Sequence, residues 1–532
     1  MKLNKGLFWG LIILIPMTFP HLGCKKFLDR KPLTATIEDL NKGALDGQVL
    51  NLYTILRTNA GFSTLPWVDF HSIRDDDAQK GSDANDGKEV NTEFETFQYT
   101  KDDWAINSYW GDHYTMINQA NSAIYAAKTS SITDEASLRN VGEACFFMAY
   151  AYFDLVKNFG EVPLINFPIL KPTDAIQPKA TIPRIYEFID SNLKVAAQYL
   201  PLTTQAYGSN YPGRLTKGAA NALWAQTYLM RSDWGKVTAL CNEVIGSGQY
   251  KLMDNFSDIW REDPSGAGKN CPESIFEMNA WMPANSVGNS NLDYGTDWGT
   301  CQQIRKNGAP VGWNLGWGWN TPTDNLVNAW SDTDPRKGKT ILFSGQSDGG
   351  PANGGHGATI PAYTNPDGNG GLAQKYWNKK LYTGNPPAMR TFTGFLGTTD
   401  GNGGARWINH RIIRYADVIL MLAEAANESN NGAVAAANLE KIRNRASGNL
   451  GPTRTVLPVI PFTTQAAMRQ AIKDERRFEF ALEGYRFYDL VRWNDAVSTL
   501  SGLGYTNRCR FYPIPQQTIN LSGGVLKQNP EW

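Results

Sequence analysis

The sequence predicts a mainly α-helical protein in which a helical scaffold carries one large, loop-rich face. Three observations predict this fold class: long segments with apolar residues at helical spacing, two pairs of helices joined by very short turns, and one stretch in which helical periodicity is lost. The scaffold is expected over about 35–260 and 405–500, and the loop-rich binding region over about 260–405. The helices would then form a rigid support, and the loops would form the functional surface.

The first 23 residues are expected to form a targeting segment. Lys2 and Lys5 give a positively charged start, and residues 7–19 form an apolar run too short to span a bilayer. Gly23 and Cys24 follow, as in a lipoprotein processing site, where Cys24 would be lipidated and become the first mature residue. Ordinary secretion with cleavage nearby is the alternative. Because no later run is long and apolar enough to cross a bilayer, we expect the protein to be anchored rather than inserted.

Length, composition and charge indicate a globular protein and argue against nucleic acid as a partner. The chain has 532 residues, of which 42% are hydrophobic and 12% aromatic. The 51 basic residues equal the 51 acidic ones; residues 1–23 hold two lysines and no acid, so the remainder has 49 against 51, a net charge of −2. Since there is no basic excess to neutralise phosphates, nucleic acid is not an expected partner.

Long helices are expected in the first half of the chain. Apolar residues recur at helical spacing over residues 104–128. A second helix is expected from Thr133 as N-cap to Gly160, and because residues 145–156 are apolar on almost every face, it should be buried all round. A third helix is expected over 183–201, with a proline at each end.

Two helix–turn–helix units follow. The first comprises residues 216–231 and 233–245, and the second residues 412–428 and 433–445. Small alanines within each helix allow close antiparallel packing. The helix lengths and short turns suit tetratricopeptide-like units of about 34 residues, although the repeat consensus is poor.

Between the early helices, residues 60–80 break the helical pattern. The segment mixes aromatic residues with three consecutive aspartates, so it is interpreted as a loop, with a hydrated turn and a binding loop both open. Its candidate ligand-binding residues are Trp67, Asp69, Arg74 and Asp76.

The loop-rich stretch 260–405 holds the strongest functional candidates. A long irregular insertion in a compact domain is usually functional or disordered, and the aromatic content argues against disorder. Flat aromatic faces stack on the C–H faces of sugar rings, while nearby amides and carboxylates bind the hydroxyl groups. The alternative is that these rings fill core between loops and helices. The aromatic candidates are Trp281, Tyr294, Trp298, Trp313 and Trp317.

Residues 475–493 are expected to form one helix around which the chain is organised. Apolar residues recur at steps of three or four and would form one face of the helix. Opposite charges three residues apart predict ion pairs on the other, solvent-facing side. Gly484 interrupts this helix at a cost of roughly 1 kcal/mol, and we expect it to let another backbone approach closely. The expected ion pairs join Arg476 to Glu479 and Asp489 to Arg492.

Signals for catalysis or metal binding are weak. No HExxH, GxSxG, Walker or Rossmann pattern occurs. A glycosidase needs two placed carboxylates, and the many Asp and Glu residues keep that alternative open. The Asp-Gly-Asn-Gly segments at Asp367 and Asp400 resemble fragments of calcium loops but lack the glutamate at position 12, so ordinary turns are expected. No cofactor or metal is therefore predicted.

Five cysteines remain after Cys24, without CxxC spacing, so a zinc site is not expected. Cys145 and Cys241 lie in apolar helical patterns and are predicted to be buried thiols. A disulfide between Cys271 and Cys301 stays open in an oxidising compartment.

Recognisable motifs occur near both ends of the chain and within it. They are KKFLD at 25–29, Asp-Asp-Ala at 76–78, EACFFMAYAYFDLVKNFGEVPLI at 143–165, ERRFEFALEGYRFYDLVRW at 475–493, and FYPIP at 511–515 with LKQNP at 526–530. Together these segments resemble the SusD/RagB family, the outer-membrane nutrient-binding lipoproteins of Bacteroidetes, and the resemblance covers the mature chain.

This resemblance implies a SusD-like nutrient-binding domain over 24–532 on a tetratricopeptide-like scaffold. It implies binding of oligo- or polysaccharide at the cell surface without catalysis, and delivery of the glycan to a SusC-like TonB-dependent transporter in the outer membrane. A surface glycoside hydrolase and a peptide-binding or adhesin lipoprotein are the alternatives. Within such a site, the residues expected to stack on sugar are Trp67, Trp313 and Trp317, with Asp69, Arg74 and Asp76 as polar partners.

Overall fold

The computed structural model confirms a mainly α-helical fold with few, short strands. It describes residues 45–84, 86, 88–208, 212–262, 267–281, 294–305, 313–367, 370–384 and 406–532, so the leader 1–23, the lipidation site Cys24 and the turn at Asp400 lie outside the described residues. The longer helices are α3 (Leu45–Thr58), α7 (Trp104–Thr129), α8 (Glu135–Phe159), α9 (Ile182–Tyr199), α10 (Lys217–Leu229), α11 (Trp234–Gly246), α16 (Tyr415–Glu428), α17 (Gly432–Ala446) and α18 (Gln465–Glu479).

Shorter elements join these helices. The short helices are α4 (Ala60–Ser63), α5 (Leu65–His71), α6 (Lys88–Glu95), α12 (Asp297–Gln302), α13 (Asp324–Ala329), α14 (Lys337–Thr340), α19 (Arg486–Arg492), α20 (Ala496–Leu500) and α21 (Gln516–Leu521). The strands are β1 (Ala78–Gly81), β2 (Val162–Pro163), β3 (Lys179–Ala180), β4 (Ser274–Met278), β5 (Trp319–Pro322), β6 (Ile341–Phe343), β7 (Tyr376–Asn378) and β8 (His410–Arg414).

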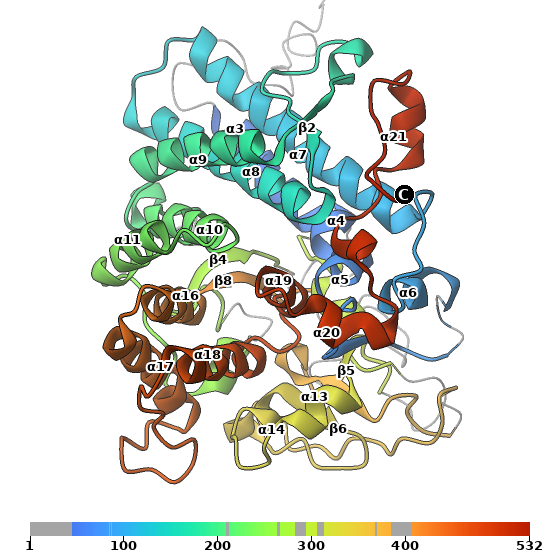
Figure 1. Cartoon of the computed structure of the whole chain (residues 1–532), viewed down its shortest axis with the longest axis vertical. Helices are drawn as coiled ribbons and strands as arrows, with labels where there is room; N and C mark the ends of the chain where they lie inside the picture. The colour runs from blue at the N-terminus through green and yellow to red at the C-terminus, as the bar shows by residue number, and fades with distance from the viewer. Residues whose placement is uncertain are drawn as a thin grey trace, which may run out of the picture.

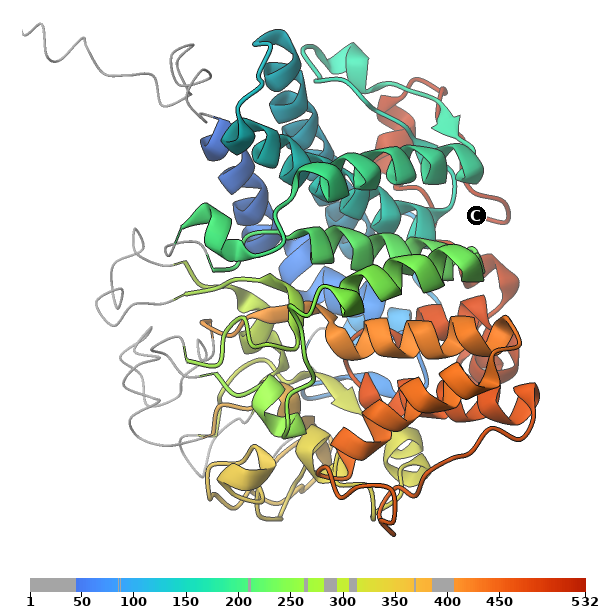
Figure 2. The same ribbon diagram turned by 90° about the vertical axis from the view of Figure 1, so that its left-hand side faces the viewer.

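The long helices pack in succession as antiparallel layers, from α7 and α8 through α9, α10 and α11 to α16, α17 and α18 (Figure 1). Figure 2 shows the layers from the side, with blue helices at the top, green in the middle and orange below. Helix α11 packs on α16 although about 170 residues separate them in sequence. The loop-rich region is thus an insertion between two stacked helix pairs.

Both predicted helix–turn–helix units are confirmed, with one change of boundary. The second unit starts at Tyr415, because Ile412–Arg414 belong to strand β8, which pairs antiparallel with β4 (Ser274↔Arg414, Met278↔His410). The predicted burial of the second helix also holds: α8 is buried over almost its whole length, and its N-cap is Asp134, whose side chain accepts a hydrogen bond from the Ser137 amide. Here the N-cap lies one residue after the predicted Thr133.

The single helix predicted over 475–493 is wrong. The chain leaves α18 at Glu479, turns through residues 480–485, and re-enters a helix as α19. Leu482 and Gly484 adopt positive φ angles of 66° and 80° within this turn. A Cβ on Gly484 would lie 2.6 Å from Cη2 of Trp67, so the glycine admits an indole side chain rather than a backbone.

Most of the charged side chains of this stretch are buried, which corrects the predicted solvent-facing side. Arg476 pairs with Asp417 at 2.7 Å and with Asp489 at 2.9 Å instead of with Glu479. The predicted pair of Asp489 with Arg492 is confirmed at 2.8 Å. The stretch is therefore part of the interior.

The loop interpretation of residues 60–80 is also wrong. Residues 60–63 and 65–71 form helices α4 and α5, and residues 78–81 form strand β1, which pairs antiparallel with β5 of the insertion (Ala78↔Pro322, Gly81↔Trp319). The segment thereby fastens the insertion to the N-terminal helices.

Two further features are the state of the cysteines and the character of the helices. Cys145 and Cys241 are buried thiols, as predicted, and Cys271 and Cys301 are likewise free and buried, so the disulfide alternative is not realised. Among the helices of the described residues, none combines the length and the apolar character needed to cross a bilayer.

Candidate functional site

The sequence-predicted site residues occupy three environments. Trp281 and Tyr294 are about half exposed, at 50% and 46%. Trp317 is partly buried against the main core, and Asp76 is partly buried in an ion-pair network. The residues with little or no exposure are Trp67, Asp69, Arg74, Trp298 and Trp313.

Trp67 and Trp298 form an interior cluster with two histidines. The ring of Trp67 lies parallel to that of His71, with centroids 4.5 Å apart, and meets Trp298 edge-on at 4.6 Å. Trp298 in turn stacks on His410 at 3.7 Å. Trp313 packs separately, in a small core within the insertion. These rings pack against other described residues of the protein. Their role in ligand binding therefore stays a prediction.

Asp76 and Arg74 join residues 72–78 to the C-terminal part of the chain. Asp76 pairs with Arg486 at 2.8 Å and with Arg477 at 3.4 Å. Burial raises the pKa of the Asp76 carboxyl, but these two cations outweigh burial and lower the pKa below its usual value. The Arg74 guanidinium lies 3.6 Å from the ring centroid of Phe487 and donates to the Cys509 carbonyl at 3.0 Å. These structural contacts therefore explain why charged residues occupy positions 74 and 76, without any need for a ligand.

Trp281 and Tyr294 are the predicted aromatic residues that the structure places together on the surface. The Trp281 amide donates to the Tyr294 carbonyl at 2.9 Å in an isolated antiparallel bridge. Their rings are nearly parallel, at 13°, with centroids 6.3 Å apart. We call this pair the aromatic platform.

Four elements, β4, β8, α12 and α3, fix the platform in place. Trp281 follows strand β4, and the preceding Ala280 amide donates to Oδ1 of Asn409 at 2.9 Å, beside β8. Tyr294 precedes α12. From the end of α3, Arg57 donates to the Gly295 carbonyl at 3.0 Å, with its guanidinium 5.8 Å from the centre of the Tyr294 ring. The platform is thus built on the scaffold rather than on a free loop.

Polar groups lie beside the platform in sequence and in space. Thr296 caps α12 and its amide donates to the carbonyl of Arg406 at 2.9 Å, and Asp297 forms an ion pair with the Arg406 side chain. Both charged side chains keep partial exposure, at 33% and 19%. They supply acceptors and donors suited to hydroxyl groups. Arg57, Asp297 and Arg406 were not among the predicted residues, because nothing in the local sequence pattern marks them.

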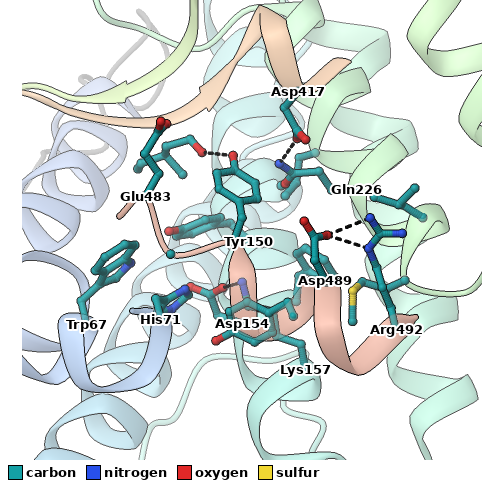
Figure 3. Close-up of a pocket in the computed structure, with 18 of the residues that line it drawn as sticks. Trp67, His71, Tyr150, Asp154, Lys157, Gln226, Asp417, Glu483, Asp489 and Arg492 are labelled. Carbon is teal, nitrogen blue, oxygen red and sulfur yellow. Dashed lines mark hydrogen bonds and ion pairs between the residues drawn. The ribbon is translucent and has the colours of Figure 1, made fainter. Parts of the chain in front are cut away.

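The interior cavity next to Trp67 is small and is lined by both apolar and charged side chains (Figure 3). Its free volume of about 80 Å³ suits a few water molecules rather than a sugar ring. Its charged groups are paired: Asp154 with Lys157 at 2.6 Å, and Asp489 with Arg492 at 2.8 Å. Burial holds the pKa of His71 well below its ordinary value. We interpret this cavity as part of the scaffold.

Glu479 and Glu483 are both held by buried cations. Burial raises the pKa of Glu479, but Arg445, Arg414 and Arg336 outweigh it and bring the value to about 2, so the carboxylate stays ionised. Glu483 is held by Arg414 at 2.8 Å and by Lys380 at 2.5 Å. Among the described residues, no group of three or more His, Cys, Asp or Glu side chains is arranged to hold a metal ion.

Comparison with known proteins identifies two matching family models. The model described as the SusD family matches residues 272–509, and the model described as starch-binding and associating with the outer membrane matches residues 26–229. SusD-like protein P2 from Formosa agariphila is 26% identical over 478 residues, covering 86% of each chain. The starch-binding protein SusD of Bacteroides thetaiotaomicron is 25% identical over 444 residues, covering 74% of this chain and 73% of the relative.

Solved structures share the fold over nearly the whole chain. A laminarin-binding SusD-like protein matches with a TM-score of 0.72 and 27% identity, covering 92% of this chain and 100% of the other. Surface glycan-binding protein A from Bacteroides fluxus matches with a TM-score of 0.73 and 24% identity, with the same coverage. The predicted helical SusD-like fold is thereby confirmed.

Proposed function

The chain belongs to the SusD family, and from that premise we propose that it is a non-catalytic glycan-binding protein whose ligand stacks on the aromatic platform. The observation that carries the proposal is the pair of half-exposed, nearly parallel rings of Trp281 and Tyr294, fixed by backbone contacts to the scaffold. Two of the similar proteins are named for their ligands, laminarin and starch. Both ligands are glucans, which supports a glucan as the first ligand to test.

The chemistry of the platform fits a sugar better than a small ion. Two fixed rings offer a large contact area and lose few rotamers on binding. Asp297 follows Tyr294 by three residues and pairs with Arg406, and both partly exposed side chains can exchange hydrogen bonds with hydroxyl groups. The platform is therefore suited to capture by stacking and hydrogen bonding.

The test is affinity gel electrophoresis of the mature protein in laminarin and in starch. Trp281→Ala and Tyr294→Ala are each expected to weaken retardation at least tenfold, about 1.4 kcal/mol of binding free energy. Trp104→Ala is the matched control, because Trp104 is a surface tryptophan with 43% exposure on α7.

Three outcomes would contradict the proposal in different ways. Retardation that survives both platform substitutions would move the glycan site elsewhere, and an equal loss in Trp104→Ala would show a non-specific effect. Release of reducing sugar by the purified protein would favour a glycoside hydrolase.

We further propose that lipid on Cys24 anchors the protein in the outer membrane and that a SusC-like TonB-dependent transporter receives its glycan. The support is family membership and the outer-membrane description of the model matching residues 26–229. Cys24→Ala should move the protein from the membrane to the soluble fraction, and affinity purification of the anchored protein should retain a barrel-sized partner. Failure of either result would count against that part of the proposal.

A further inference from the structure

A second cavity, of about 490 Å³, lies away from the platform residues, where the ends of α8 and α10 meet the first turn of α9. Residues 510 and 511 of the C-terminal segment close it. Tyr186 and Phe511 give its wall two aromatic rings, and Lys157, Arg231 and Arg510 bring three cations. Among the described lining residues the one carboxylate is Glu187, which is 66% exposed and pairs outward with Arg184 at 3.0 Å.

Two of the three cations have their charge compensated. The Lys157 ammonium lies 2.6 Å from Oδ1 of Asp154. The Arg231 guanidinium binds both carboxylate oxygens of Asp190 at 2.8 Å. Neither needs a further anion to be stable where it lies.

Arg510 is different. Its Nη1 is fully buried and, within the described part of the chain, has no hydrogen-bond partner. No described carboxylate lies within ion-pair distance of its guanidinium, whose neighbour is the ring of Phe511, 4.8 Å away. The Arg510 side chain as a whole is only partly buried and lines the cavity, and a desolvated charge without a partner is costly, so this guanidinium is a candidate for an external counter-ion.

A second uncompensated guanidinium makes the region still more positive. Arg74 is fully buried and also lacks an ion pair with any described carboxylate. Burial, together with the charge of Arg74, lowers the pKa of Arg510. The described carboxylates thus leave this part of the molecule with excess positive charge, of which Arg510 lines the cavity and Arg74 lies behind it in the core.

We propose that this cavity binds an oxyanion group, such as a sulfate, phosphate or carboxylate, with the Arg510 guanidinium as its principal contact. The planar fork of a guanidinium matches two oxygens of such a group, and Lys157 and Arg231 lie on the same wall. The cavity has room for more than a bare ion, and its aromatic rings suit the ring of an acidic sugar. This site is independent of the glycan platform.

The test is calorimetric titration of the whole mature protein with sodium sulfate, sodium phosphate and sodium D-glucuronate, at constant ionic strength set by sodium chloride. D-glucose serves as the uncharged comparison. We expect saturable binding of at least one anion and no binding of glucose. Arg510→Gln should weaken that binding at least tenfold, whereas Arg184→Gln, which removes an exposed arginine outside the cavity, should leave it unchanged.

The source of the oxyanion follows from the pattern of binding. Tighter binding of glucuronate assigns an acidic sugar, and tighter binding of sulfate or phosphate assigns an inorganic anion or its ester.

Because the Arg510 charge has no partner, Arg510→Gln should fold with an unchanged or higher Tm. Absence of saturable binding to the wild-type protein overturns the proposal without any variant, as does undiminished binding by Arg510→Gln or equal weakening in Arg184→Gln.

Discussion

His410 shows how the interior sets the protonation of a single residue. Its ring lies between Trp298, at 3.7 Å, and the edge of Trp67, at 4.7 Å, and burial lowers its pKa to about 3. In the unfolded chain a histidine titrates near pH 6.5. Between these values the unfolded state binds a proton that the folded state does not, so stability must fall as the pH drops below 6.5.

Removing this histidine should therefore flatten the acid side of the stability curve. Between pH 6 and pH 4.5, we expect His410→Gln to reduce the slope of unfolding free energy against pH by about 1.4 kcal/mol per pH unit. Urea unfolding at several pH values measures that slope. The other titratable groups are common to both proteins, so an unchanged slope would mean that His410 is protonated in the folded state.

At the scale of elements, the turn between α18 and α19 depends on Gly484. Its φ of 80° disfavours any side chain, and a Cβ there would lie 2.6 Å from Cη2 of Trp67 and 2.9 Å from Cβ of His71. Gly484→Ala should lower the free energy of unfolding by more than about 2 kcal/mol, because backbone strain and overpacking add.

Gly448 provides the matched control for that substitution. Its φ of 88° is similar, but a Cβ there would meet no atom within 4 Å. Gly448→Ala should therefore cost only the strain of a left-handed backbone, about 1–2 kcal/mol. If urea unfolding gave the two variants equal losses, the contact with Trp67 would not matter for the turn.

Local pattern predicted the helices well and the turns poorly. Residues 104–128 and both helix–turn–helix units have enough apolar periodicity to be found from sequence alone. The break after Glu479 could not be found that way, because strong helix formers surround it and the cause is a distant indole. In the same way, the short helix α5 is stabilised by burial of its aromatic residues rather than by a helical pattern.

Composition predicted which stretch holds the candidate site but not which residues are exposed. Trp281 and Trp298 lie in the same aromatic-rich stretch, yet one is 50% exposed and the other stacks on His410. Exposure is decided by how the insertion folds back on α3, β4 and β8. That long-range information leaves no local signal at Arg57 or Arg406.

At the scale of the whole molecule, a buried ion network ties the insertion to the helical stack. The Glu479 carboxylate, at the end of α18, lies 3.1 Å from Arg336 of the insertion and 3.1 Å from Arg414 of β8, and it also pairs with Arg445 of α17. Glu273 of the insertion binds Arg414 at 2.6 Å. The charges of residues 475–493 therefore join three parts of the chain that are distant in sequence.

Neutralising the centre of this network should loosen the attachment of the insertion. Glu479→Gln keeps the size of the side chain but leaves Arg336, Arg414 and Arg445 with less compensation, so the free energy of unfolding at pH 7 should fall by about 3–5 kcal/mol. Glu135→Gln, at an exposed pair with Arg139, should cost less than about 1 kcal/mol.

The pH dependence of that loss separates charge from packing. The folded pKa of Glu479 is depressed to about 2, so its contribution is fully present above the unfolded value near 4.5 and declines as the pH falls from there. The stability difference between wild type and Glu479→Gln, measured by urea unfolding, should shrink from pH 7 to pH 3.5. A difference that stayed constant over this range would mean that the glutamate acts through shape, and that the network of arginines does not need its charge.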